Sequence, residues 1–145
     1  MKGGEDMLDM EINYIAVLVT AIISMVLGGI WYSPMLFGKM WAKEMGWNDE
    51  EMKKRQKEGA MKGYIVMFIG ALVMQYILAH FVQYTDADTF MLGATTGFWL
   101  WLGFIVTIMV PNIFWEGKSM RAVSINVLYQ LINLLIAGGI LAIWV

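Results

Sequence analysis

The sequence has no cysteine, a single histidine and only two prolines, and just 15% of its 145 residues are charged. The absence of cysteine excludes disulfide bonds, thiolate metal ligands and a thiol nucleophile. With one histidine, a side-chain metal site would have to be built almost wholly from carboxylates. The net charge of −2 provides no basic field to attract nucleic acid. We therefore expect no cofactor, no metal site and no nucleic-acid partner.

Hydrophobic residues make up 59% of the chain, far more than a soluble domain of this length can bury. They are gathered in four apolar runs, at residues 12–32, 64–84, 89–110 and 123–144, none of which contains Asp, Glu, Lys or Arg. Each run corresponds to about 31–33 Å of helix, against a hydrocarbon core of roughly 30 Å. The pattern predicts a single integral membrane domain over residues 1–145, an all-α bundle of four transmembrane helices.

The basic residues are distributed unequally along the chain. Nine of the ten lie in residues 33–63 or in the connection between the third and fourth runs, and the exception is Lys2. Basic loops are retained in the cytoplasm. The acidic start of the chain is unlike the basic n-region of a secretory signal, so the first run should remain as an anchor. We expect a multi-pass protein of the cell membrane, with residues 33–63 in the cytoplasm and both termini outside.

Residues 33–63 have helical signals of their own. Ser33 and Pro34 are typical of a helix start, and apolar residues recur at helical spacing as far as Gly46, which predicts a short helix in the membrane interface. Asn48 and Glu51 have the spacing of a capping box and predict a second helix.

The second of these helices is rich in charge, and we expect it to run through Gly59 into the second apolar run as a solvated stalk. A solvated face is the usual meaning of such a charge run. The alternative is contact with anionic lipid, which polybasic segments next to a membrane attract. The basic residues available for that contact are Lys53, Lys54, Arg55 and Lys57.

The ends of the first and third runs resemble each other. Pro34 is followed by Gly38-Lys39, and Pro111 is followed by Gly117-Lys118. Two helical hairpins related as a parallel repeat would explain the likeness. Similar helix-stop chemistry at one membrane surface would explain it equally well.

Small residues are spaced for close helix packing. Gly93 and Gly97 form a GxxxG pair, and a longer ladder recurs every fourth position of the first run at Ala16, Thr20, Ser24 and Gly28. Inside lipid, small side chains let helix backbones approach closely. These positions predict packing surfaces, either within the chain or between chains, and we expect a homo-oligomer.

The fourth run carries Asn126, Gln130 and Asn133 at positions i, i+4 and i+7 of one helical face. Amides that face lipid are costly, so all three should face the bundle or a water-filled cavity. Interhelical hydrogen bonds, worth on average about 0.6 kcal/mol each, explain one such amide more easily than three. We therefore treat this stripe as a candidate ligand site or polar cavity.

Three further residues join the candidate site. His80 lies near the outer end of the second run, where a lone histidine is typically an interfacial hydrogen-bonding group. Asn112 and Glu116 follow Pro111, and Glu116 is most simply paired with Lys118 or Arg121. The sequence offers no nucleophile–base pair, so we name no catalytic residue and rank an enzyme last.

The runs Ile12–Val17, Gly28–Pro34 with Leu36–Lys39, Gly97–Phe104 and Asn112–Gly117 are similar to a known family. The chain resembles domain of unknown function 1761, a family of small prokaryotic membrane proteins. The resemblance implies a four-span membrane fold and supplies no activity or catalytic residue.

Two functions fit these patterns. The first is a small transporter or channel component with a polar site on the fourth helix, which requires a continuous polar path between the membrane faces. The second is a structural or regulatory oligomeric membrane protein without transport or catalysis. That role requires every amide to be paired with another protein group.

Overall fold

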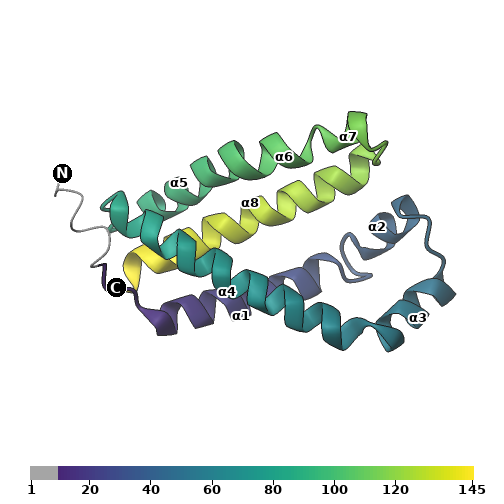
Figure 1. Ribbon diagram of the computed structural model, residues 1–145, viewed down its shortest axis with the longest axis horizontal. Coiled ribbons are helices and arrows are strands. Elements are labelled where there is room, and N and C mark those ends of the chain that lie inside the picture. Colours follow the sequence, from purple (N-terminus) through teal and green to yellow (C-terminus); the bar gives the residue numbers. More distant parts are fainter. Residues whose placement is uncertain (1–9) are drawn as a thin grey trace.

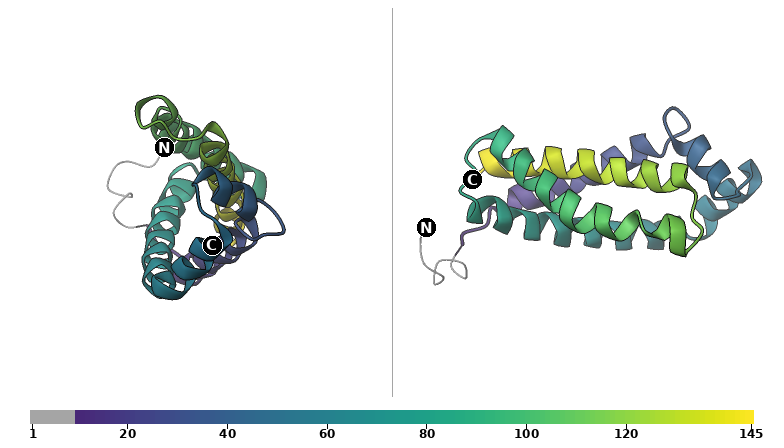
Figure 2. Two further views of the ribbon diagram at one scale, coloured as in Figure 1. Left: turned by 90° about the vertical axis from the view of Figure 1, so that its right-hand side faces the viewer. Right: turned by 90° about the horizontal axis from the view of Figure 1, so that it is seen from above.

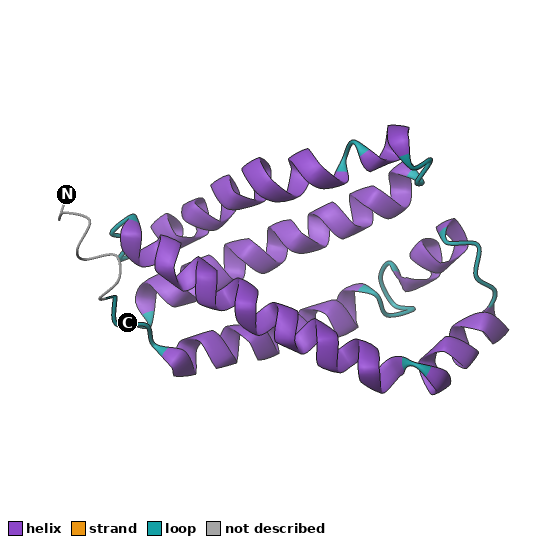
Figure 3. Ribbon diagram, viewed as in Figure 1, coloured by secondary structure: helices purple, strands orange, loops and turns teal. Residues whose placement is uncertain are grey.

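The computed structural model describes residues 10–145, and this part of the chain contains helices and loops without a strand (Figure 3). Its elements are α1 (Tyr14–Trp31), α2 (Gly38–Glu44), α3 (Asp49–Glu58), α4 (Ala60–Tyr84), α5 (Phe90–Leu100), the π-helix η1 (Trp101–Val106), α6 (Thr107–Met109), α7 (Asn112–Trp115) and α8 (Met120–Ile143). The prediction of an all-α fold is confirmed.

Four helical stretches are long and apolar enough to cross a membrane: α1, α4, the stretch from α5 to α7 (Phe90–Trp115), and α8. This agrees with a multi-pass membrane protein and confirms the four-span bundle. Helices α4 and α8 begin earlier than their apolar runs, and their first turns contain the basic residues Lys62 and Arg121. Helix α8 is capped by Ser119, whose hydroxyl oxygen accepts a hydrogen bond from the Ala122 amide at 3.4 Å.

Helix α8 is the central element of the bundle. It runs between the α5–α7 stretch and the pair formed by α1 and α4, and it packs on all three (Figures 1 and 2). Half of its most apolar window is buried, against 6% for the α5–α7 stretch. The third span is therefore attached to the bundle through one face, mainly on α8.

That attachment uses the predicted small residues. A Cβ atom added to Gly93 would lie 2.0 Å from the carbonyl oxygen of Gly138, and one added to Gly97 would lie 2.2 Å from that of Leu134. The backbones of α5 and α8 thus touch at both glycines. The GxxxG pair serves packing within the chain.

Residues 33–46 differ from the prediction. Ser33 to Phe37 form turns, and α2 begins at Gly38 instead of Pro34. The Gly38 amide donates to the Ser33 carbonyl at 2.9 Å, and a Cβ at Gly38 would lie 2.3 Å from the carbonyl oxygen of Tyr32. The chain folds back onto the end of α1 here, which leaves no room for a helix starting at Pro34.

The second helix of this segment is confirmed at its start and wrong at its end. The Asn48 side-chain oxygen accepts from the Glu51 amide at 2.8 Å, so Asn48 caps α3 as predicted. Helix α3 stops at Glu58, and Gly59, with φ −136° and ψ 0°, separates it from α4. The stalk is therefore a separate helix and not a continuation of the second span.

The hydrophobic core fills the end of the bundle where α1 begins and where α4 and α8 end, opposite α2 and α3 (Figure 1). Its members include Ala16 and Val17 of α1, Leu78 and Val82 of α4, and Leu141 of α8. Leu78 and Val82 are only 2% and 1% exposed. Three buried polar side chains, Ser24, Gln75 and Asn133, lie nearer its other end.

Candidate functional site

Three buried polar side chains meet in the middle third of three different spans. They are Ser24 of α1, Gln75 of α4 and Asn133 of α8. The Gln75 side-chain nitrogen donates to the Ser24 hydroxyl oxygen at 2.8 Å, and the Ser24 hydroxyl donates to the side-chain oxygen of Asn133. We call these three residues the polar layer.

The hydrogen bonds of Ser24 agree with the orientation of the Gln75 amide. Ser24 has one hydroxyl hydrogen, which it donates to Asn133, so it can only accept from Gln75. The NH₂ group of Gln75 therefore faces Ser24, and its carbonyl oxygen Oε1 faces away. Gln75 is 0% exposed, and its Oε1 has no hydrogen-bond partner within residues 10–145.

Gln130 adds a second unpaired acceptor. It lies one turn before Asn133 on the same face of α8, and its buried Oε1 atom also lacks a partner in the described part of the chain. The Asn133 amide nitrogen faces the sulfur of Met74 at 3.8 Å, and a thioether is only a weak acceptor. Two buried acceptor oxygens and one amide nitrogen of this region are therefore left without a strong hydrogen-bond partner.

Two tyrosines connect the polar layer to the end of the bundle that carries α2. The Tyr129 hydroxyl donates to the carbonyl oxygen of Ser24 at 2.8 Å, and the Tyr32 hydroxyl donates to Asn126 Oδ1 at 2.5 Å. The two tyrosine rings pack edge to face with centroids 5.6 Å apart. Polar groups thus form a track from the end of α1 to the middle of the bundle.

The track ends at the polar layer. Beyond Asn133 the same face of α8 presents Ala137 and Leu141, which pack in the hydrophobic core with Leu78 and Val82. Thr20, one turn from Ser24, directs its hydroxyl to the carbonyls of Ala16 and Val17 on its own helix. The polar path therefore covers one half of the bundle, and apolar side chains close the other half.

The π-helix η1 lies beside this region. The Trp101 indole nitrogen, at the start of η1, donates to the Val127 carbonyl of α8 at 2.8 Å. The Trp31 indole nitrogen of α1 donates to the Ile125 carbonyl at 3.1 Å. Two tryptophans, one from the first span and one from the third, thus donate hydrogen bonds to carbonyls in the same turn of α8. Short π-helical stretches are frequent at functional sites.

Of the six candidate residues from the sequence, the three amides of α8 lie along one stripe and the other three lie elsewhere. His80 Nδ1 is 2.9 Å from the Tyr76 carbonyl, and its ring packs on Tyr76 with centroids 4.6 Å apart. Glu116 forms an exposed salt bridge with Lys118 at 2.9 Å, one of the two partners expected for it. The carbonyl of Asn112 accepts from the amides of Glu116 and Lys118 in the turn that closes α7.

Sequence reasoning missed Ser24, Gln75 and the two tyrosines as parts of this site. Ser24 belongs to the predicted ladder of small residues, which indicates helix packing and not a polar site. One signal was available. Gln75 is an amide in the middle of an apolar run, where its side chain cannot reach either membrane surface.

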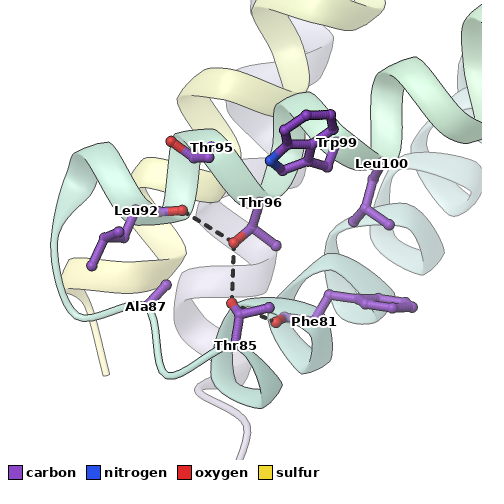
Figure 4. A pocket seen from close by; sticks show the side chains of 8 residues that line it. All are labelled: Phe81, Thr85, Ala87, Leu92, Thr95, Thr96, Trp99 and Leu100. Atoms are coloured by element: carbon purple, nitrogen blue, oxygen red, sulfur yellow. Dashed lines mark hydrogen bonds between the residues drawn. The ribbon is translucent and has the colours of Figure 1, made fainter.

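A separate pocket of about 320 Å³ lies where α4 turns into α5 (Figure 4). Its lining is mainly apolar and includes Phe81, Leu92 and Trp99. The hydroxyls of Thr85 and Thr96 lie 3.1 Å apart, and each also bonds a carbonyl of its own helix. Both threonine hydroxyls are therefore already paired.

Chemically, the polar layer is uncharged. No Asp, Glu, Lys or Arg lies in the middle third of α1, α4 or α8, and no group of three His, Asp or Glu within residues 10–145 could hold a metal. Buried carbonyl oxygens with free lone pairs bind hydrogen-bond donors or small cations. Such a site can bind and orient a solute.

The chain matches a protein family whose description gives no activity. No curated protein and no solved structure matches the chain. The family match covers residues 15–142, which include the whole polar layer and the resembling motifs except the first residues of Ile12–Val17. The chain belongs to the family described as protein of unknown function (DUF1761).

Proposed function

We propose that the protein is a small component of a membrane transport or channel system that binds a small hydrogen-bond donor at the polar layer. The observation that carries this proposal is the carbonyl oxygen of Gln75, which is fully buried in mid-bundle and unpaired. Water, ammonium and small hydroxylated solutes have the required chemistry.

The energetic argument rests on the cost of an unpaired amide. A buried acceptor without a partner costs about 1–3 kcal/mol, and lipid chains cannot satisfy it. Two such buried oxygens, on Gln75 and Gln130, lack a partner in the described part of the chain. A donor bound there would recover that cost. A donor would gain little free energy from a carbonyl exposed to water, because water already donates a hydrogen bond to it.

The polar track supplies a route for the solute from the α2 end of the bundle. The basic residues around α2, α3 and the start of α8 support a cytoplasmic position for this end, with both termini outside and the protein in the cell membrane. Transport then requires a second conformation, in which the packing around Leu78 and Val82 separates. The polar layer would then be accessible from the opposite face of the membrane. Exchange between two such packings is the principle of alternating access.

The experiment is a stopped-flow flux assay on proteoliposomes, with water, ammonium and glycerol as separate solutes. We expect flux of at least one solute above that of protein-free liposomes, and loss of this excess in Gln75→Leu, which keeps a similar volume without an acceptor. Gln83→Leu is the matched control, because Gln83 lies at the end of the same helix and bonds the Glu11 carbonyl at 2.7 Å. No excess flux for any solute, or equal flux in wild type and Gln75→Leu, would reject the proposal.

A structural or regulatory role is the second candidate, and a different observation favours it. Ser24, Asn133 and Tyr129 are joined by hydrogen bonds that tie α1 to α8. In this role the protein has no flux, and it would act as a homo-oligomer through the exposed faces of the α5–α7 span. Native mass spectrometry in mild detergent tests the oligomer, and a monomer at all protein concentrations would exclude it.

A further inference from the structure

A pocket of about 500 Å³ lies between α2 and α3, outside the polar layer. Helix α2 follows α1 after the turns of residues 32–37, and α3 leads into α4 (Figure 1). The pocket therefore lies beside the ends of two spans. Gly38, which allows α2 to fold back onto Tyr32, forms part of its wall. The position of the pocket is therefore determined by the same close contact that starts α2.

Two cations line the pocket from one face of α2. Lys39 and Lys43 are one helical turn apart, and neither ammonium group has a carboxylate within 4 Å among residues 10–145. The lining contains one carboxylate, that of Asp49, in the first turn of α3. Two lysines against one aspartate leave the pocket with a net positive charge.

The rest of the lining suits the boundary between headgroups and acyl chains. Pro34, Ala42, Trp47 and Met52 supply apolar surface. Trp47 packs on Trp41 with ring centroids 5.1 Å apart, and the Arg55 guanidinium lies 4.2 Å above the Trp47 ring. Tryptophan and tyrosine side chains gather at the headgroup level of membranes. A positively charged pocket with an apolar wall at this level fits an anionic headgroup together with its glycerol.

We propose that this pocket binds a phosphate group, supplied in the membrane by the headgroup of an anionic phospholipid. Lys39 and Lys43 hold the phosphate oxygens, and Trp47 and Met52 contact the glycerol and the first acyl carbons. This differs from diffuse attraction of lipid by Lys53, Lys54, Arg55 and Lys57, because it places the phosphate between two specific lysines of another helix.

The experiment titrates the full-length, delipidated protein in detergent with phosphatidylglycerol and measures bound lipid by native mass spectrometry. The test variant is Lys39→Gln with Lys43→Gln. The matched control is Lys53→Gln with Lys57→Gln, which removes the same charge at the same helical spacing from α3. The melting temperature of both variants should equal that of the wild type, since all four lysines are exposed.

We expect the test variant to bind phosphatidylglycerol roughly ten- to thirtyfold more weakly, since a lysine near an anionic surface contributes about fivefold. The control variant should change affinity by less than about twofold. Equal losses in the two variants would mean diffuse charge attraction, and no loss in the test variant would mean no role for Lys39 and Lys43. Either result would overturn the proposal.

Competition with inorganic phosphate distinguishes the source of the phosphate. Displacement of phosphatidylglycerol by millimolar inorganic phosphate would show that the anion alone fills the site. Retention of the lipid, with weaker binding of phosphatidylcholine, would identify the phospholipid as the ligand. Binding of phosphatidylcholine and phosphatidylglycerol with equal affinity would contradict a site built on charge.

Discussion

Gly93 of α5 and Gly138 of α8 lie backbone against backbone. A Cβ atom on Gly93 would lie 2.0 Å from the Gly138 carbonyl oxygen, and one on Gly138 would lie 2.3 Å from that of Gly93. Neither position can carry a side chain unless the helices separate. The third span has little buried surface, and this contact and that of Gly97 are close backbone approaches that help attach it to the rest of the bundle.

Gly93→Leu and Gly97→Leu should each destabilise the protein, by about 1–3 kcal/mol, because a bulky side chain would be forced against the backbone of α8. The measurement is the thermal unfolding midpoint in detergent. Gly70→Leu is the control, since a Cβ there meets nothing within 4 Å and faces outward on α4. If Gly93→Leu melts like Gly70→Leu, the close approach of α5 and α8 is wrong.

Ser24→Ala should lower stability by about 1–3 kcal/mol, because it leaves the Gln75 amide and the Asn133 carbonyl oxygen buried without their shared partner. Thr95→Ala is the control. The Thr95 hydroxyl is exposed and bonds only the Met91 carbonyl of its own helix. The comparison is made by thermal unfolding. An unfolding midpoint in Ser24→Ala as high as that of the control would show that the three-residue layer does not hold the spans together.

The four spans could be predicted because length and apolar content alone decide whether a helix suits a bilayer. The cap at Asn48 was also predictable, since it depends on residues three apart. The start of α2 was not. Ser33 and Pro34 are compatible with a helix start, and what prevents one is the contact of Gly38 with the backbone of Tyr32. A local pattern does not reveal that the chain folds back.

The candidate site, too, could be predicted only in part from the sequence. The stripe of Asn126, Gln130 and Asn133 follows from the period of one helix. Its partners Ser24 and Gln75 come from two other spans, and which faces meet depends on packing in three dimensions. The π-helix at Trp101 likewise has no signal in an unbroken apolar run, and the bond of Trp101 to the Val127 carbonyl comes from another span.

The orientation in the membrane is a prediction that labelling can test on a chain without native cysteine. Lys54→Cys should be protected from a membrane-impermeant thiol reagent in intact cells, whereas Asp86→Cys should react, because basic loops stay in the cytoplasm. Permeabilised cells provide the control, in which both variants should be labelled. If only Lys54→Cys were labelled in intact cells, the protein would have the opposite orientation in the membrane.

The transport proposal leads to a test of the closed half of the bundle. Leu78 is 2% exposed in the core beyond the polar layer, and Leu78→Ala would open space there at a cost of about 2–5 kcal/mol in stability. We expect the variant to increase solute flux in proteoliposomes if the polar layer is part of the path. Leu128→Ala is the matched control, because Leu128 is exposed on the outer side of α8.

A double variant separates a selective path from simple leakage. Gln75→Leu removes the acceptor at the polar layer, so flux through the layer should fall again when it is combined with Leu78→Ala. A leak caused by loosened packing would be as large in the double variant as in Leu78→Ala alone. The same comparison with Gln130→Leu tests the second unpaired oxygen, which lies on the stripe of α8. If neither substitution reduces the flux opened by Leu78→Ala, the polar layer is not on the path, and its amides act only in holding α1, α4 and α8 together.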